Sequence, residues 1–312
     1  MAKGMSDPCF AVAVSPGGVL RGFPMRARHL LLPALLVLVP TAGRAHPPAV
    51  TAPVALFASG LTGPEGLAFD KTGGLVVGST TGEIRRFAPD GTSTVLANVG
   101  DSLAGLTVRR DGRVLAAAFA AGRVWSINQA GVVSLVANVP SVNVVVETRA
   151  GRTLASSSFP GTIVDITSGT PVTVASGLAF PNGLAIRGDG YLYVAETAAG
   201  RISRLPLAAD GTLGAAEVYA TGTPAADGIA FDRRGNLLVV GLDSVRAVDR
   251  ASRAVTVLST ASLVDWPSNL AFGRGHGFKP REAYMVNYGA PLGSGSTLVR
   301  FGYNHKGAPL IR

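Results

Sequence analysis

The sequence repeats a short pattern six times, and this repeat restricts the fold more than any other feature. Each repeat opens with one residue, called the head here, that stands just before or at the start of a short apolar strand. The six heads are Glu65, Ala104, Asn143, Asn182, Asp227 and Ser268. They are separated by 39, 39, 39, 45 and 41 residues, and periods of about 40 to 45 are typical of four-stranded propeller blades. We therefore predict an all-β fold, a six-bladed β-propeller with four-stranded blades.

The first repeat shows what one unit contains. An apolar stretch at 67–69 leads through a glycine turn to a second apolar stretch at 75–77. A third strand at 83–87 is followed by the turn "PDG" and a fourth strand at 94–97. The chain holds 40 Gly and 20 Pro, which suits many strands joined by tight turns. Long segments with helical periodicity are missing, so the composition agrees with the repeat.

The two ends of the repeat region indicate how the ring closes. The segment "PVALFASG" at 53–60 resembles the fourth strands "STVLANVG" and "VSLVANVP", yet it precedes the first complete repeat. The last repeat shows only three strands, around Leu270, Tyr284 and Val299. We predict that the N-terminal strand completes the last blade and so removes an open sheet edge. Residues 46–312 then form a single domain.

Residues 1–45 have the features of a targeting region, and Met25 is a candidate for the true start. A basic stretch at 25–28 precedes the apolar core "HLLLPALLVLVP", and the small residues of "TAGRA" follow before His46. This order is that of a secretory signal peptide. About a dozen apolar residues interrupted by Pro33 are too few to span a bilayer. We therefore expect export to the periplasm or the cell exterior, with no stable membrane insertion after processing.

Several classes of chemistry are disfavoured by composition. Cys9 is the only cysteine, so no disulfide within the chain, cysteine nucleophile or thiolate metal site is available beyond residue 45. No G-x-S-x-G motif marks a serine nucleophile, and only His276 and His305 remain as bases after the targeting region. Beyond residue 45 there are 23 basic and 18 acidic residues, scattered along the chain, which argues against nucleic acid as a partner.

The heads are candidates for a metal site. In a propeller the first strand of each blade lines the central channel, so six equivalent positions encircle one mouth. Glu65 and Asp227 supply carboxylates, and Asn143 and Asn182 supply amides, which are oxygen ligands that a hard divalent cation binds. A cation would also compensate the charge of Glu65, since an ionised carboxylate is costly to bury alone.

A simpler interpretation is that these residues are turn formers. Asn, Asp and Ser often precede glycine in turns for conformational reasons alone. This accounts poorly for Glu65, because glutamate is not a turn former, and for the presence of carboxylates and amides in one ring. The pattern favours a metal site, and the turn-former interpretation stays open as the alternative.

Several motifs together resemble one known family. They are "PEGLAFD", "FPNGLAI", "YVAETAAGRISR", "ADGIAFDRRGNLLVV" and the closing "PSNLAFG" and "EAYMVNYG". In order and spacing, over roughly residues 54–310, they resemble the SMP-30/gluconolactonase/LRE-like family, the regucalcin-like six-bladed propellers. The resemblance implies that Glu65, Asn182 and Asp227 bind one divalent cation, calcium first, with zinc or magnesium as alternatives. It also implies that Asn143 contacts the substrate and that Asp227 is catalytic, handling the proton of the attacking water.

Two positions depart from the family pattern. Members that act on sugar lactones usually carry an Arg two residues before the third-blade Asn, where this chain has Ser141. They also tend to place an acidic residue in the following loop, which here reads "SSSFPGT". The departures concern the recognition of a sugar and leave the metal site intact.

Aromatic and polar residues are expected to surround the same mouth. Trp266 and Phe180 lie in the connections that enter blades six and four, and we assign Trp266 to substrate binding. Further candidates lie where second and third strands are joined. They are Phe119, Phe159, Glu196, Asp243 and Tyr288.

The leading hypothesis is therefore a secreted, monomeric, metal-dependent hydrolase that acts on a small-molecule lactone or related ester. One alternative is a non-catalytic binding propeller of the NHL type with a structural ion, since "PEGLAFD" also resembles NHL-repeat proteins. Another is a strictosidine-synthase-like or virginiamycin B lyase-like enzyme, because "VAETAAGRISR" and "PEGLAFD" resemble those propellers too. Fold alone does not decide between these reactions.

Overall fold

The computed structural model describes residues 47–70, 72–275, 277–289 and 296–309. Residues 47–309 belong to one compact unit that begins at His46. The predicted targeting region, 1–45, lies outside the described residues, as does His276, so export stays a prediction. Within the described ranges there is no helix long and apolar enough to cross a membrane.

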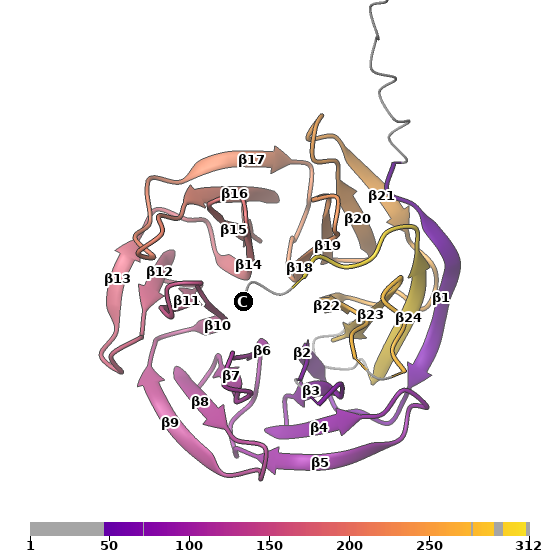
Figure 1. Ribbon diagram of the computed structural model, residues 1–312, viewed down its shortest axis with the longest axis horizontal. Coiled ribbons are helices and arrows are strands. Elements are labelled where there is room, and N and C mark those ends of the chain that lie inside the picture. Colours follow the sequence, from indigo (N-terminus) through magenta and orange to yellow (C-terminus); the bar gives the residue numbers. More distant parts are fainter. Residues whose placement is uncertain (1–46, 71, 276, 290–295, 310–312) are drawn as a thin grey trace, which may run out of the picture. The chain divides into compact units, whose positions relative to one another are not determined.

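The described residues form six antiparallel sheets of four strands, which confirms the predicted fold class. In Figure 1 the sheets stand like blades around a common central axis, and the chain passes from one blade to the next in sequence order. In blades one to five the innermost strand is the first in sequence, whereas in blade six it is β22 and the earlier strand β1 lies at the outer edge. These inner strands are β2, β6, β10, β14, β18 and β22.

The first three blades follow one another along the chain. Blade one consists of β2 (Pro64–Phe69), β3 (Leu75–Ser79), β4 (Glu83–Phe87) and β5 (Ser93–Asn98). Blade two consists of β6 (Leu106–Val108), β7 (Val114–Ala118), β8 (Arg123–Ile127) and β9 (Val133–Asn138). Blade three consists of β10 (Val142–Glu147), β11 (Thr153–Ser157), β12 (Thr162–Asp165) and β13 (Val172–Ala175).

The remaining blades differ in how the last one is completed. Blade four consists of β14 (Pro181–Arg187), β15 (Tyr191–Glu196), β16 (Arg201–Pro206) and β17 (Glu217–Thr221). Blade five consists of β18 (Ile229–Phe231), β19 (Leu237–Gly241), β20 (Ser244–Val248) and β21 (Val255–Ser259). Blade six consists of β22 (Pro267–Phe272), β23 (Glu282–Asn287), β24 (Thr297–Tyr303) and, at its outer edge, β1 (Val50–Ala58).

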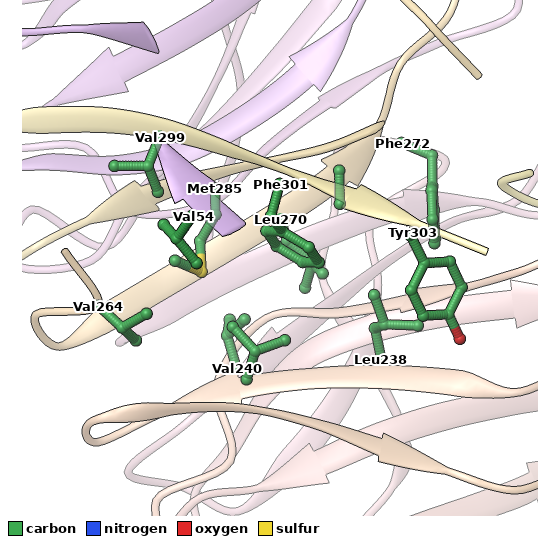
Figure 2. Close-up of a cluster of buried hydrophobic side chains, with 12 residues drawn as sticks. Val54, Leu238, Val240, Val264, Leu270, Phe272, Met285, Val299, Phe301 and Tyr303 are labelled. Atoms are coloured by element: carbon green, nitrogen blue, oxygen red, sulfur yellow. The ribbon is translucent and has the colours of Figure 1, made fainter. Parts of the chain in front are cut away.

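The closing strand is the predicted one. β1 pairs antiparallel with β24, with Leu56 opposite Val299. Val54 of β1 is buried in an apolar cluster that also contains Leu238 and Val240 of blade five. In Figure 2 these two side chains face those contributed by blade six. The first described strand therefore completes the last blade and adds to the core between blades five and six.

Burial explains why most residues of the second strands are apolar. β3, β7, β11 and β19 are buried at every position, because both faces of a middle strand pack against neighbouring blades. A continuous apolar run is what such a strand requires. The fourth strands β5 and β9 lie at the rim, and each has only one fully buried residue. The apolar cores therefore lie between neighbouring blades, and the inner strand of each blade lies nearest the central axis.

Candidate metal site at the mouth of the channel

A repeated backbone conformation positions the heads. Two residues before the head, five of the six blades have a residue with positive φ. These residues are Gly63 (53°), Ser141 (51°), Phe180 (57°), Ala225 (48°) and Trp266 (45°). The left-handed conformation suits glycine and costs other residues about 1–2 kcal/mol. The turn is therefore imposed by the path of the chain from the rim of one blade to the channel strand of the next.

The glycines that follow the heads are required by contacts between blades. A Cβ on Gly183 would lie 2.1 Å from the main-chain oxygen of Asp227, the head of the next blade. A Cβ on Gly66 would likewise lie 2.3 Å from the oxygen of Ala104. At these two positions glycine is required by the close packing of one blade against the next head.

Hydrogen bonds join several neighbouring heads. The amide of Gly105 donates to the carbonyl of Asn143, and the amide of Gly228 donates to the carbonyl of Ser268, each at 2.8 Å. The Ser268 hydroxyl donates to the carbonyl of Glu65 at 2.9 Å and so joins the last blade to the first. The heads are thus held at one end of the channel by backbone contacts.

Glu65 and Asp227 lie close enough to interact. Burial raises the pKa of Glu65 to about 7, against an ordinary value of 4.5, and Ser268 lowers it slightly by hydrogen bonding. Burial also raises the pKa of Asp227 well above its usual range, with the charge of Glu65 as the second cause. No cationic group among the described residues offsets either charge. Two carboxylates at one site disfavour double ionisation unless a positive charge is added.

Asn182 completes the group. Its side chain hydrogen-bonds to Asp227 and lowers the pKa of that carboxyl, against the larger effect of burial. Oδ1 of Asn182 and Oε2 of Glu65 are both buried without a hydrogen-bond partner. Buried polar atoms without partners are rare in folded proteins and ask for an explanation. The structure thus brings the three predicted metal ligands together, and their unpartnered oxygens are the donor type that a hard divalent cation binds.

The donor set contains only two carboxylates. The described residues include no group of three or more His, Cys, Asp or Glu side chains suited to a metal. A site built here would therefore rely on amide oxygen as well as carboxylate, as the heads predict. Such an all-oxygen set fits calcium or magnesium more closely than zinc, which takes nitrogen and sulfur ligands as a rule.

Asn143 lies in the same ring with its side chain buried. Its amide nitrogen donates to the hydroxyl of Ser158 at 3.4 Å, and Ser158 in turn donates to the carbonyl of Pro181 at 2.8 Å. These bonds connect blades three and four just behind the mouth. Asn143 is therefore held in place, while its role towards a substrate stays a prediction.

Trp266 and Tyr288 lie on the blade-six side of the mouth. Trp266 is half-buried, and its carbonyl accepts a hydrogen bond from the amide of Tyr288 at 3.0 Å. Burial raises the pKa of Tyr288, and the nearby charge of Glu65 raises it further. Tyr288 thus lies beside the carboxylate pair, as expected of a residue that surrounds the mouth.

Glu196 is not a free group in a loop, as its predicted position implied. It is the last residue of β15, fully buried, and forms two hydrogen bonds with Arg201, at 2.8 and 2.9 Å. The amide of Ala179 donates to it at 2.7 Å. Burial alone would raise the pKa of Glu196, but these bonds outweigh it and the pKa is lowered. Glu196 links blade four to the connection that precedes it by hydrogen bonds. Both of its carboxylate oxygens already accept hydrogen bonds within the protein, so neither is free to bind a ligand.

A second buried polar cluster lies away from the mouth. Nδ1 of His305 lies 2.8 Å from Asp232, which also accepts hydrogen bonds from Tyr303 and Asn236. Asp232 follows β18, whereas the head Asp227 precedes it, so the two carboxylates stand at opposite ends of that strand. His305 is therefore remote from the ring, and the sequence pattern had given no sign of its pairing with Asp232.

Comparison with known proteins supports the predicted resemblance. Residues 147–286 match the family described as the SMP-30/Gluconolactonase/LRE-like region. Residues 55–87 match the family described as strictosidine synthase-like, N-terminal. A comparison with curated protein sequences finds no match.

Solved structures of the same fold include two with related names. A gluconolactonase from Xanthomonas campestris is 18% identical, with a TM-score of 0.67 over 83% of this chain and 96% of that one. A calcium-binding protein, regucalcin, from Agrobacterium tumefaciens is 19% identical, with a TM-score of 0.68 over 85% and 98%. Virginiamycin B lyase from Staphylococcus aureus is 19% identical, with a TM-score of 0.56 over 73% and 79%. At these identities the likeness concerns the fold.

Proposed function

Since this chain carries the SMP-30/gluconolactonase/LRE-like sequence region over residues 147–286, we propose that it is a metal-dependent hydrolase of lactones or related esters. One observation supports this most directly. Glu65 and Asp227 share a channel mouth without a cationic partner among the described residues, and oxygens of Glu65 and Asn182 lack partners beside them. A divalent cation held by these three side chains would offset the charges and occupy the unpartnered oxygens.

Calcium is the cation proposed first, with zinc or magnesium as alternatives. When bound, the cation would supply positive charge beside the carbonyl oxygen of the substrate. Hydrolysis adds water across the bond between the acyl carbon and the ring oxygen, and a lactone yields a hydroxy acid. The chain's own residues must then take up a proton from water and hold the substrate in position.

Asp227 is the proposed proton acceptor. A general base must lie within reach of the proton that it takes up, and Asp227 supplies one of the two carboxylates at the mouth, where the substrate carbonyl would lie. Asn143, one of the heads between Ala104 and Asn182, would orient the substrate through its amide. Trp266 would flank the substrate on the side of blade six.

The competing proposal is a binding propeller whose ion only stabilises the ring. The two proposals differ in one measurable respect. If the ion is only structural, substitution of one of its ligands would weaken ion binding but would change no rate of hydrolysis. Other reactions on the same fold remain alternatives. Residues 55–87 match the strictosidine synthase-like family, and virginiamycin B lyase has the same fold. The group of Glu65, Asn182 and Asp227 is the reason to put hydrolysis first.

The deciding experiment uses the mature chain, residues 46–312. Bound metal is measured by elemental analysis, and a panel of lactones and aryl esters is screened with calcium, with zinc and with chelator. We expect hydrolysis that chelator abolishes and that Asp227→Asn reduces at least a hundredfold, the scale of a lost general base. If Asp227→Asn hydrolyses as fast as the parent, the active site lies elsewhere.

Export is proposed from the sequence of residues 25–45 alone. We expect the mature protein to begin near His46 in the periplasm or outside the cell. The measurement is the intact mass of the exported protein. A mass that includes residues 30–45 would contradict the proposal.

A further inference from the structure

Three phenylalanines from different blades meet beside the ring of heads. Phe119 follows β7, Phe159 follows β11, and Phe180 precedes β14. The ring centroids of Phe119 and Phe159 are 5.5 Å apart, as are those of Phe159 and Phe180, both in edge-on contact. Because first strands begin and second strands end at the head side, all three lie at the mouth that carries the candidate site.

One member of this aromatic cluster is exposed to an unusual degree, while Phe119 and Phe180 are half-buried. Phe159 exposes 74% of its surface, although phenylalanine is among the residues most often buried. Phe180 holds a left-handed backbone conformation with φ 57°, where blade one uses Gly63. Glycine would satisfy that turn without strain, so the turn itself gives no reason for a phenyl group at residue 180. An exposed phenyl ring that packs against an aromatic residue in a strained conformation is typical of a binding surface.

A groove of about 550 Å³ runs beside the cluster. It lies between the loop after β7 and the connection into β10, and Phe119 and Phe159 line one part of it. None of its nine lining residues is charged. The volume is that of a small-molecule site. Polar backbone groups line part of the groove, and the two phenyl rings give it an apolar part that suits an uncharged, apolar group of a small ligand.

The groove adjoins the ring through residues close to Asn143 in the chain and in space. Ser141, one of its lining residues, lies two residues before the head Asn143. Ser158, which accepts the hydrogen bond from Asn143, directly precedes Phe159. A molecule that contacts Asn143 at the mouth can thus extend over Ser141 towards the phenyl rings.

We propose that the aromatic cluster and its groove are a subsite for an apolar substituent, so that the substrate is a lactone or ester bearing an aryl or alkyl group. This inference rests on the proposed function. A polyhydroxylated substituent would suit the groove badly, because each hydroxyl that leaves water needs a hydrogen-bond partner. Among the groove's lining residues only Asn138 and Ser141 have polar side chains.

The test compares γ-phenyl-γ-butyrolactone with unsubstituted γ-butyrolactone, using the calcium-loaded chain. We expect the parent to prefer the phenyl lactone by roughly tenfold in kcat/KM, the effect of burying part of a phenyl group. Phe159→Ser should remove most of this preference through KM, and Phe159→Leu, which stays apolar, should keep part of it. Because Phe159 is exposed, neither variant should unfold the chain. Equal rates for both lactones, or a preference unchanged in Phe159→Ser, would overturn the inference.

The matched control is Val132→Ser. Val132 is 62% exposed and lies in the turn between β8 and β9, at the end of blade two opposite the mouth. The substitution Val132→Ser should leave the hydrolysis rates of both lactones unchanged. A loss of preference in this variant equal to that in Phe159→Ser would also overturn the inference, since the effect would not be local.

A binding measurement separates this inference from the proposed function. Calorimetry measures the affinity of the chain for the γ-phenyl lactam of the same ring size and for the unsubstituted lactam. This measurement does not depend on hydrolysis. If no lactone is hydrolysed under any condition, the proposed function fails. Tighter binding of the phenyl lactam that Phe159→Ser weakens would then still support the subsite, and equal binding of the two lactams would overturn it.

Discussion

The carboxylates of Glu65 and Asp227, heads of the first and fifth blades, lie close enough at one channel mouth for the charge of Glu65 to raise the pKa of Asp227. The two residues are 162 positions apart in sequence, and only the closed ring brings them together. Each is surrounded by protein, and burial is the largest cause of both raised pKa values. When both carboxylates are ionised, their charges repel each other, and a bound cation would offset this repulsion.

Asp227→Asn should therefore have opposite effects on stability and on cation binding. Without a cation the free energy of unfolding should stay equal or rise, because the repulsion from Glu65 is removed. The dissociation constant for calcium should rise at least tenfold, about 1.4 kcal/mol. Thermal unfolding with chelator and calorimetric titration with calcium measure the two effects.

Ala104→Ser is the control for that prediction. Ala104 occupies an equivalent head position but offers no ligand, so the added hydroxyl should leave calcium binding nearly unchanged. If the parent protein binds no divalent cation at millimolar concentration, the ring of heads is structural and the metal proposal fails.

The pKa of Glu65 predicts a pH dependence in the cation-free protein. Glu65 titrates near 7 in the folded chain and near 4.5 in the unfolded one, so between these values the folded state holds a proton that the unfolded state has released. Stability then falls as pH rises through this range. Melting temperatures in chelator should accordingly be lower at about pH 8 than at about pH 5, and Glu65→Gln should flatten the difference.

Calcium should counteract this pH dependence. Binding requires ionised carboxylates, so added calcium should raise the melting temperature more at about pH 8 than at about pH 5. An equal rise at both pH values would show that calcium binds away from Glu65 and Asp227.

The repeat made much of the fold predictable. The strand expected at 83–87 is β4 (Glu83–Phe87), and the segment at 53–60 overlaps β1 (Val50–Ala58), which closes blade six as expected. Such features are local patterns recurring at a fixed period, and a period of that length constrains the whole architecture. The proximity of Glu65, Asn182 and Asp227 followed from the same equivalence between blades.

Other parts of the site depend on contacts that no local pattern shows. Nothing about Phe180 or Trp266 as residue types predicts a positive φ; the path between blades imposes it. Glu196 was expected to be available at the mouth because it stands near a loop. Its partners Arg201 and Ala179 could be identified only after the strands were placed.

Gly183→Ala tests whether the ring depends on close contact between heads. The added methyl group would lie 2.1 Å from the main-chain oxygen of Asp227, so the backbone of one blade must shift. We expect a loss of about 1–3 kcal/mol in the free energy of unfolding, the usual range for overpacking, together with weaker calcium binding. Gly188→Ala is the control, because a Cβ there meets nothing within 4 Å. Equal stability of the two variants would show that the ring tolerates displacement.

The closing strand can be tested by placing a charge at a buried position and, in a second variant, at an exposed position. Val54 is 9% exposed and packs in the cluster between blades five and six, whereas Leu56 on the same strand is 50% exposed. Val54→Asp must bury a carboxylate in an apolar core and should lower the free energy of unfolding by about 3 kcal/mol or more. Leu56→Asp keeps its charge in water and should cost about 1 kcal/mol at most, the range of strand propensity. Chemical denaturation of both variants measures the difference. If the two substitutions cost the same, β1 covers the edge of blade six without contributing to its core.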